Sequence, residues 1–183
     1  RAISDVGQGV YYYIDSPEAI PTSFADCLGG LLSVVAQNVS IAVYPLGGCS
    51  LAPIQSRYQM EHLEGGGVKV VLGDVNAEEE KDLVLWLELP AHCPKADQHE
   101  TTMCRLILEY FCPATAEYHK EIEAVKVERS SHQGDVNLDV EEHVLRVKAA
   151  LAVDQANESA KRGNLDAGRA QLRAMCQTMK ESP

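Results

Sequence analysis

Apolar positions change their spacing twice along the 183-residue chain, which divides it into three predicted segments. In residues 1–37, a run of aromatic and β-branched residues at positions 9–14 is typical of a strand. A broad apolar stripe at helical spacing follows Pro21 and predicts a helix from about Thr22 or Ser23. A strand joined to such a helix is half of an α/β unit and cannot bury both of its faces alone. We therefore expect residues 1–37 to be the end of a larger α/β domain. The helical stripe consists of Phe24, Cys27, Leu28, Leu31, Leu32, Val34 and Val35.

The period shortens in residues 38–130, where apolar and polar residues alternate as they do in half-buried strands. Turn signals separate the alternating runs: a glycine-rich stretch near 64–67, an acidic run at 76–82 and a polar loop at 91–100. Six or seven short strands with turns between them predict an antiparallel β-sandwich, and we expect Trp86 inside it. The predicted strands lie at residues 39–43, 54–61, 68–72, 83–89, 102–110 and 122–127.

Residues 131–183 begin with a polar linker and return to helical spacing. Asp139 and acidic neighbours open a first helix, and Gly163 and Asn164 are a good stop before a second one. Two helices across a short turn predict an antiparallel helical hairpin. The predicted fold is thus mainly β with α. The apolar positions of the two helices are Val140, Val144, Val147 and Leu151, then Leu165, Gly168, Leu172, Met175 and Met179.

Charge and cysteine content narrow the partners and the compartment. Lys plus Arg is 16 and Asp plus Glu is 27, so the formal net charge is −11, which disfavours nucleic acid and anionic membranes as partners. The longest apolar stretches are far shorter than the roughly 20 residues of a membrane span. Six scattered cysteines are too sparse for a disulfide scaffold and favour reduced thiols in the cytoplasm. The first residues carry no signal-peptide pattern and no initiator Met, so we expect the chain to begin inside a longer product.

Motifs that would carry chemistry are weak. Zinc ligands usually come in tight pairs such as Cys-x-x-Cys, and the histidines and cysteines here form no such pair. Gly29 and Gly30 lie in the helical stripe without the Lys-Ser/Thr of a phosphate loop, which favours close helix packing. The glycines before Cys49 lack the second half of a nucleophile elbow. We expect no catalytic residue, no cofactor site and no metal site. The scattered candidates were His92, Cys93, His99, Cys104, Cys112 and His119.

Several stretches together resemble the C-terminal region of eukaryotic von Willebrand factor A (vWA) proteins. They are the aromatic run at 9–14, the Cys-Leu-Gly-Gly-Leu-Leu-Ser stretch from Cys27, the Leu-Gly-Asp-Val stretch from Leu72 with the acidic run after it, and the helical pattern from Val140. The order is similar to that of vWA proteins with an intein-like Hint domain and of plant vWA proteins with a RING finger. The family's Asp-x-Ser-x-Ser metal motif, the RING cysteines and the Hint motif are absent, so no site residue carries over.

The resemblance and the missing chemistry together predict a non-catalytic protein-interaction or scaffold module: residues 1–37 as the last strand and helix of a vWA-like domain, 38–130 as the sandwich, and 131–183 as linker and hairpin. Two alternatives stay open: a substrate-recruiting C-terminal part of a vWA–RING E3 ubiquitin ligase, and a structural subunit of a large assembly. We expect the helix of residues 24–35 to lie at an interface with another protein surface, unless it folds back on the sandwich. The expected partner-binding residues are Phe24, Leu28, Leu31 and Leu32.

Overall fold

The computed structural model describes residues 3–4, 7, 9–90, 100–128 and 135–181. The chain divides into two compact units, each made of separate stretches of sequence. Residues 1–49, 58–81 and 102–126 form the first, here called the sheet unit. Residues 50–57, 82–101 and 127–183 form the second, here called the helical unit. Both units draw on the segment 38–130 that the sequence pattern treats as one domain.

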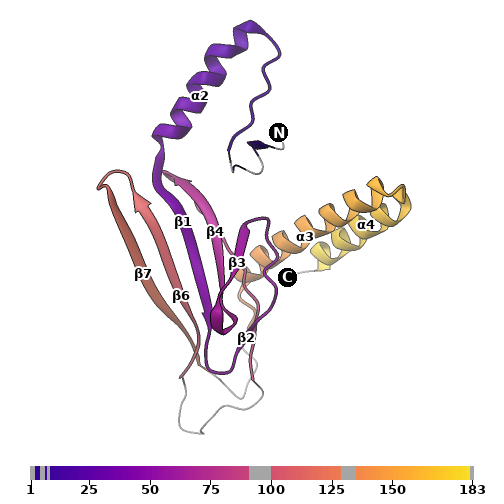
Figure 1. The fold of residues 1–183 in the computed structure, drawn as a ribbon. Coiled ribbons are helices and arrows are strands. Elements are labelled where there is room, and N and C mark those ends of the chain that lie inside the picture. Colours follow the sequence, from indigo (N-terminus) through magenta and orange to yellow (C-terminus); the bar gives the residue numbers. More distant parts are fainter. Residues whose placement is uncertain (1–2, 5–6, 8, 91–99, 129–134, 182–183) are drawn as a thin grey trace. The chain divides into compact units, whose positions relative to one another are not determined.

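Five strands make one sheet in the order β3-β4-β1-β6-β7 (Figure 1). The long strand β1 lies in the centre and pairs antiparallel with β4 on one side and with β6 on the other. β3 pairs antiparallel with β4, and β7 follows β6 across a four-residue turn. The bounds are β1 Val34–Pro45, β3 Gln59–His62, β4 Val68–Asn76, β6 Glu100–Cys112 and β7 Glu117–Glu128.

The core of the sheet unit follows from the central place of β1. β1 has a paired strand on each side, and residues on both of its faces are buried, including Ala42 and the fully buried Val43. Val70 of β4 and Cys104 of β6 are buried beside it. Strand predictions at 39–43, 68–72, 102–110 and 122–127 are therefore confirmed, each within a longer strand.

The predicted strand at residues 9–14 is wrong, because these residues form no helix or strand and their side chains are exposed. Aromatic and β-branched residues favour a strand only where a neighbouring strand can pair with them, and no described strand does so here. The helix is right in kind but not in its bounds. It is α2 (Ile20–Leu32), preceded by a 3-10 turn η1 (Pro17–Ala19), and Val34 and Val35 belong to β1. Pro21 stands at the start of the helix, where its missing N–H has no intrahelical partner to lose.

In the helical unit, β2 (Ser50–Leu51) and β5 (Leu87–Glu88) form a two-stranded sheet. The predicted strands at 54–61 and 83–89 shrink to β3 and β5, and the residues before each are irregular. Trp86 is half-buried, and its carbonyl accepts a hydrogen bond from the Ala52 amide at 2.9 Å. The sandwich is not confirmed, since the described strands form one five-stranded and one two-stranded sheet.

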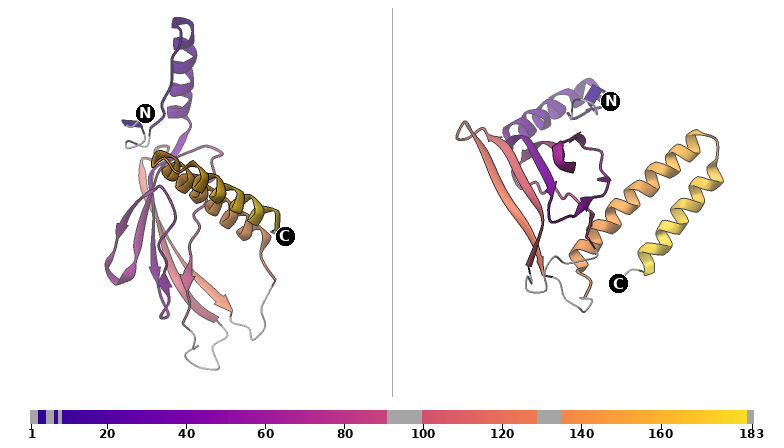
Figure 2. Two further views of the ribbon diagram at one scale, coloured as in Figure 1. Left: turned by 90° about the vertical axis from the view of Figure 1, so that its right-hand side faces the viewer. Right: turned by 60° about the horizontal axis from the view of Figure 1, so that its bottom comes forward.

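Two long helices, α3 (Leu138–Lys161) and α4 (Leu165–Glu181), complete the helical unit and lie side by side (Figure 2). The Asn137 side chain caps α3 by accepting from the amides of Asp139 and Val140. Gly163, at φ 82°, turns the chain between the helices, a conformation that glycine adopts without strain. Gly168 of α4 packs against the backbone of Ala156 of α3.

Salt bridges within the helical unit tie α3 to the irregular segments. Arg57 pairs with Asp154, and Arg146 pairs with Asp82 at 3.3 Å. His143 lies 3.5 Å from the same Asp82 carboxylate. These pairs are exposed, so each is expected to add less than about 1 kcal/mol.

Candidate protein-interaction surface

The described helix α2 presents an uncovered apolar face. At 100° per residue, Ile20, Phe24, Leu28, Leu31 and Leu32 share an arc of roughly 120°. In the described chain Phe24 is 63%, Leu28 56%, Leu31 67% and Leu32 87% exposed. We call Phe24, Leu28, Leu31 and Leu32 the α2 face. All four expected partner-binding residues therefore lie together on one exposed surface, and the sheet that α2 leads into does not cover them.

A polar junction fixes where α2 ends and β1 begins. The Ser33 amide donates to the carbonyls of Gly29 and Gly30, which closes the last turn. Its hydroxyl lies 3.0 Å from the side-chain oxygen of Asn76, at the end of β4. Its carbonyl accepts from the Ala77 amide at 2.7 Å. The hydrogen bonds of Ser33 thus join the end of α2 to the end of β4.

The acidic run after β4 stabilises this junction. The Glu79 carboxylate accepts from the backbone amide of Asn76 at 2.9 Å and from its side-chain amide at 3.0 Å. These bonds to Asn76 and the nearby Lys81 ammonium lower the pKa of Glu79. Lys81 also donates to the carbonyls of Leu72 and Asp74. The sequence marks this run only as a turn signal, which does not predict the contacts of Glu79 and Lys81.

The two glycines of α2 do not pack closely within the described chain. A Cβ at Gly29 or at Gly30 would meet no atom within 4 Å. Close packing, which the sequence favoured at this pair, is therefore not seen in the described residues. Both glycines also lower the intrinsic stability of a helix that is only 13 residues long and carries one charged residue, Asp26.

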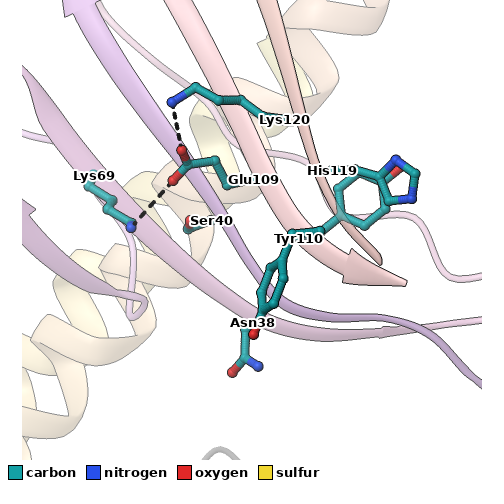
Figure 3. Close-up of a pocket in the computed structure, with 8 residues that line it drawn as sticks. Asn38, Ser40, Lys69, Glu109, Tyr110, His119 and Lys120 are labelled. Atoms are coloured by element: carbon teal, nitrogen blue, oxygen red, sulfur yellow. Dashed lines mark hydrogen bonds and ion pairs between the residues drawn. The ribbon is translucent and has the colours of Figure 1, made fainter. Parts of the chain in front are cut away.

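A pocket of about 460 Å³ lies on the sheet unit, lined by residues of β1, β4, β6 and β7 (Figure 3). The Glu109 carboxylate accepts a hydrogen bond from the Lys120 ammonium at 2.9 Å, and the Lys69 ammonium lies 3.8 Å from it. The hydrogen bond and the charge of Lys120 lower the pKa of Glu109 and keep it ionised. An acid held ionised in this way is poorly suited to donate a proton near neutral pH. Tyr110 and His119 stack with ring centroids 5.0 Å apart.

The scattered His and Cys candidates do not converge in the part of the chain that is described. No group of three or more His, Cys, Asp or Glu residues there has the arrangement of a metal site. Cys104 is buried, and desolvation raises the pKa of its thiol. Cys112 is the last residue of β6, and hydrogen bonds from Thr115 lower the pKa of its thiol. His92, Cys93 and His99 lie outside the described residues.

No described helix is both long enough and apolar enough to cross a membrane.

Comparisons with known proteins connect the chain to vWA proteins in structure and to a ubiquitin ligase in sequence. No family model matches the chain. It is similar in structure to a von Willebrand factor type A protein from Catenulispora acidiphila, with a TM-score of 0.62 and 13% identity, over 97% of this chain and 44% of that one. The ArnB paralog VWA2 from Sulfolobus acidocaldarius is matched with a TM-score of 0.40 and 14% identity, over 95% of this chain and 41% of that one.

In sequence, the chain is 35% identical over 80 residues to the E3 ubiquitin-protein ligase WAV3 of Arabidopsis thaliana. That match takes in 42% of this chain and 11% of the ligase. The chain thus spans less than half of the matched structures and about a tenth of the ligase. The first structural match shows that the chain shares a mixed α and β fold with part of a vWA protein.

Proposed function

We propose that this chain is a non-catalytic protein-interaction module of a vWA protein, and that the α2 face is its contact surface. The observation that carries the proposal is the exposure of four large apolar side chains on one helix face. Burying each such side chain contributes roughly 1.5–3 kcal/mol, and leaving all four in water forfeits that free energy. A contiguous exposed apolar patch of this kind is typical of a protein-binding surface.

The proposed occupant of the α2 face is an α/β domain of the vWA type. The structural match leaves more than half of the Catenulispora acidiphila vWA protein uncovered. In the described chain the registered strand pairs are all antiparallel, so no parallel sheet is present there for α2 to cover. Helices with a single apolar face are the layer that covers parallel sheets in α/β domains. The helix would then be the C-terminal helix of that layer, followed by the β-rich part described above.

The direct test replaces two residues of the α2 face by serine, as Leu28→Ser with Leu31→Ser. The tagged chain is purified from the cells that make it, its bound protein is identified, and the affinity is measured again with both proteins purified. Removing two apolar anchors from the contact should weaken binding by at least about 100-fold. Thermal unfolding of the chain alone should hardly change, because both side chains are already exposed.

Leu138→Ser with Val140→Ser is the matched control, since both residues are exposed on α3 of the helical unit. This control should keep the affinity of the unchanged chain. Equal binding by the α2 variant and the control would contradict the proposal. So would a bound protein without any vWA-type α/β domain.

A second candidate function is favoured by the sequence match to the ubiquitin ligase. In that case the chain recruits substrate to a vWA–RING ligase, and ubiquitin transfer itself lies in another module. The chain alone, with ubiquitin, activating enzyme and conjugating enzyme, should then form no ubiquitin chains. A protein bound to the α2 face should acquire ubiquitin in the presence of the ligase, and the Leu28→Ser and Leu31→Ser variant should prevent this. If the bound protein acquired no ubiquitin, the ligase hypothesis would be rejected and the proposal of an interaction module would remain.

A cytoplasmic location is part of the same proposal. The five described cysteines, Cys27, Cys49, Cys104, Cys112 and Cys176, form no disulfide. Free thiols persist in reducing compartments, which supports this location.

A further inference from the structure

β7 is a long outer strand, and no further described strand lies at its outer edge. It has 12 residues, and in the sheet order only β6 stands beside it. The opposite edge of the sheet is protected in a usual way, because β3 is only four residues long. β7 contains no proline and no glycine, and it is thus long enough and regular enough to accept a further strand.

Contacts with β6 fix which β7 side chains share a face. Tyr118 lies against Phe111, with ring centroids 5.0 Å apart, and Lys120 pairs with Glu109 of the same β6 face. His119 stacks on Tyr110 and so lies on the other face. Because side chains alternate along a strand, Tyr118, Lys120 and Ile122 share one face with each other. Tyr118 is 82% exposed and Ile122 58% exposed.

The other face of β7 carries an acidic row. Glu117, Glu121 and Glu123 have the same parity as His119, and all three glutamates are exposed. Among the described residues, Glu121 and Glu123 take part in no ion pair. Charged side chains on an edge strand can prevent aggregation whichever face they lie on. That role therefore does not require acidic and basic residues to lie on different faces. Here the three glutamates share one face with the exposed Val127, whereas Tyr118, Lys120 and Ile122 lie on the other face.

We propose that the outer edge of β7, along Glu117 to Glu123, binds an extended protein segment by strand addition, and that this segment alternates Lys or Arg with apolar residues. The basic side chains would pair with Glu117, Glu121 and Glu123, and the apolar ones would lie beside Tyr118 and Ile122. Main-chain hydrogen bonds along the edge would supply affinity, and the two rows of side chains would supply specificity. This surface is separate from the α2 face and does not depend on it.

A second copy of the chain is a poorer occupant. Two antiparallel strands related by a two-fold axis keep the same faces together, so the acidic row of one β7 would lie beside the acidic row of the other. Like charges that face each other across strands are destabilising. A segment with basic side chains would instead be attracted to the glutamates of β7.

The test uses four ten-residue peptides with blocked ends and the whole chain. One alternates lysine and valine, one alternates glutamate and valine, one has the lysines and valines in scrambled order, and one is the first peptide with N-methyl groups on alternate residues. The alternating lysine peptide should protect β7 amides from hydrogen exchange and bind at least about tenfold more tightly than the glutamate peptide. N-methylation should abolish this protection, because it removes the main-chain donors at the new strand.

Glu121→Lys with Glu123→Lys should lower the affinity for the lysine peptide about tenfold and turn the preference toward the glutamate peptide. Glu61→Lys with Glu64→Lys makes the same change in net charge near β3 and should change the affinity less than about twofold. Equal losses in both variants, or equal binding of the scrambled or N-methylated peptide, would show general charge attraction and overturn strand addition. Dimerisation through β7, or no binding, would overturn it too. The Leu28→Ser and Leu31→Ser variant should bind the peptide normally, so failure here leaves the α2 proposal standing.

Discussion

At the residue scale, a few polar groups decide where the exposed helix stops. Ser33 ends α2 because its amide, hydroxyl and carbonyl all find partners at the turn into β1. Its partner Asn76 lies 43 residues further along the chain, so no local pattern could predict the bond. The apolar stripe predicts a helix through Phe24 and Leu28, whereas the stop at Ser33 depends on tertiary contacts.

Acid should loosen this junction through Glu79. Its pKa is lowered from an ordinary value of 4.5 by the bonds to Asn76, so its contribution is present above that pH and is lost as the pH falls below it. We expect the hydrogen-exchange protection of Ala77, whose amide bonds to Ser33, to fall in the same pH range. Glu79→Gln should remove this pH dependence, and Glu80→Gln should keep it. Protection of Ala77 that does not change with pH would contradict the role given to Glu79.

At the element scale, long periodic segments were predicted better than short ones. α3 and α4 were predicted within a few residues, because their apolar spacing, the acidic start at Asp139 and the stop at Gly163 agree. The aromatic run at 9–14 failed, because strand formation requires a pairing partner that propensity cannot supply. The segment 54–61 alternates and 83–89 is a nearly continuous apolar run, yet only β3 and β5 form strands in these regions.

Two glycine-to-alanine changes should act in opposite directions on the helices. A Cβ at Gly168 would stand 2.9 Å from the carbonyl oxygen of Ala156, so Gly168→Ala must push α4 away from α3. We expect it to lower the stability of the helical unit by about 1 kcal/mol or more. Gly29→Ala meets open space and should stabilise α2 by about 0.5–1 kcal/mol. Circular dichroism during thermal unfolding measures the first effect, and amide exchange in α2 measures the second. If Gly168→Ala raised the stability instead, α4 would accommodate the methyl group without cost, which would contradict close packing at Gly168.

At the scale of the whole molecule, the chain forms two compact units instead of three consecutive segments. The sequence pattern cannot show this, because residues 50–57 and 82–90 belong to the helical unit, although their neighbours in sequence belong to the sheet unit. What the pattern did predict is the feature on which the functional proposal rests. The apolar face of α2 is exposed in the described chain, although the strand predicted before it at residues 9–14 does not form.

The most direct measurement of that claim is a photo-crosslinking scan of α2 in cells. A photoreactive amino acid is placed singly at Phe24, Leu28 and Leu31 on the α2 face, and at Thr22, Asp26 and Gly29 away from it. If the α2 face packs against a vWA-type α/β domain, the first three positions should yield one common crosslink to such a domain and the other three should yield little. Crosslinks that occur equally at all six positions, or at none of them, would contradict the account.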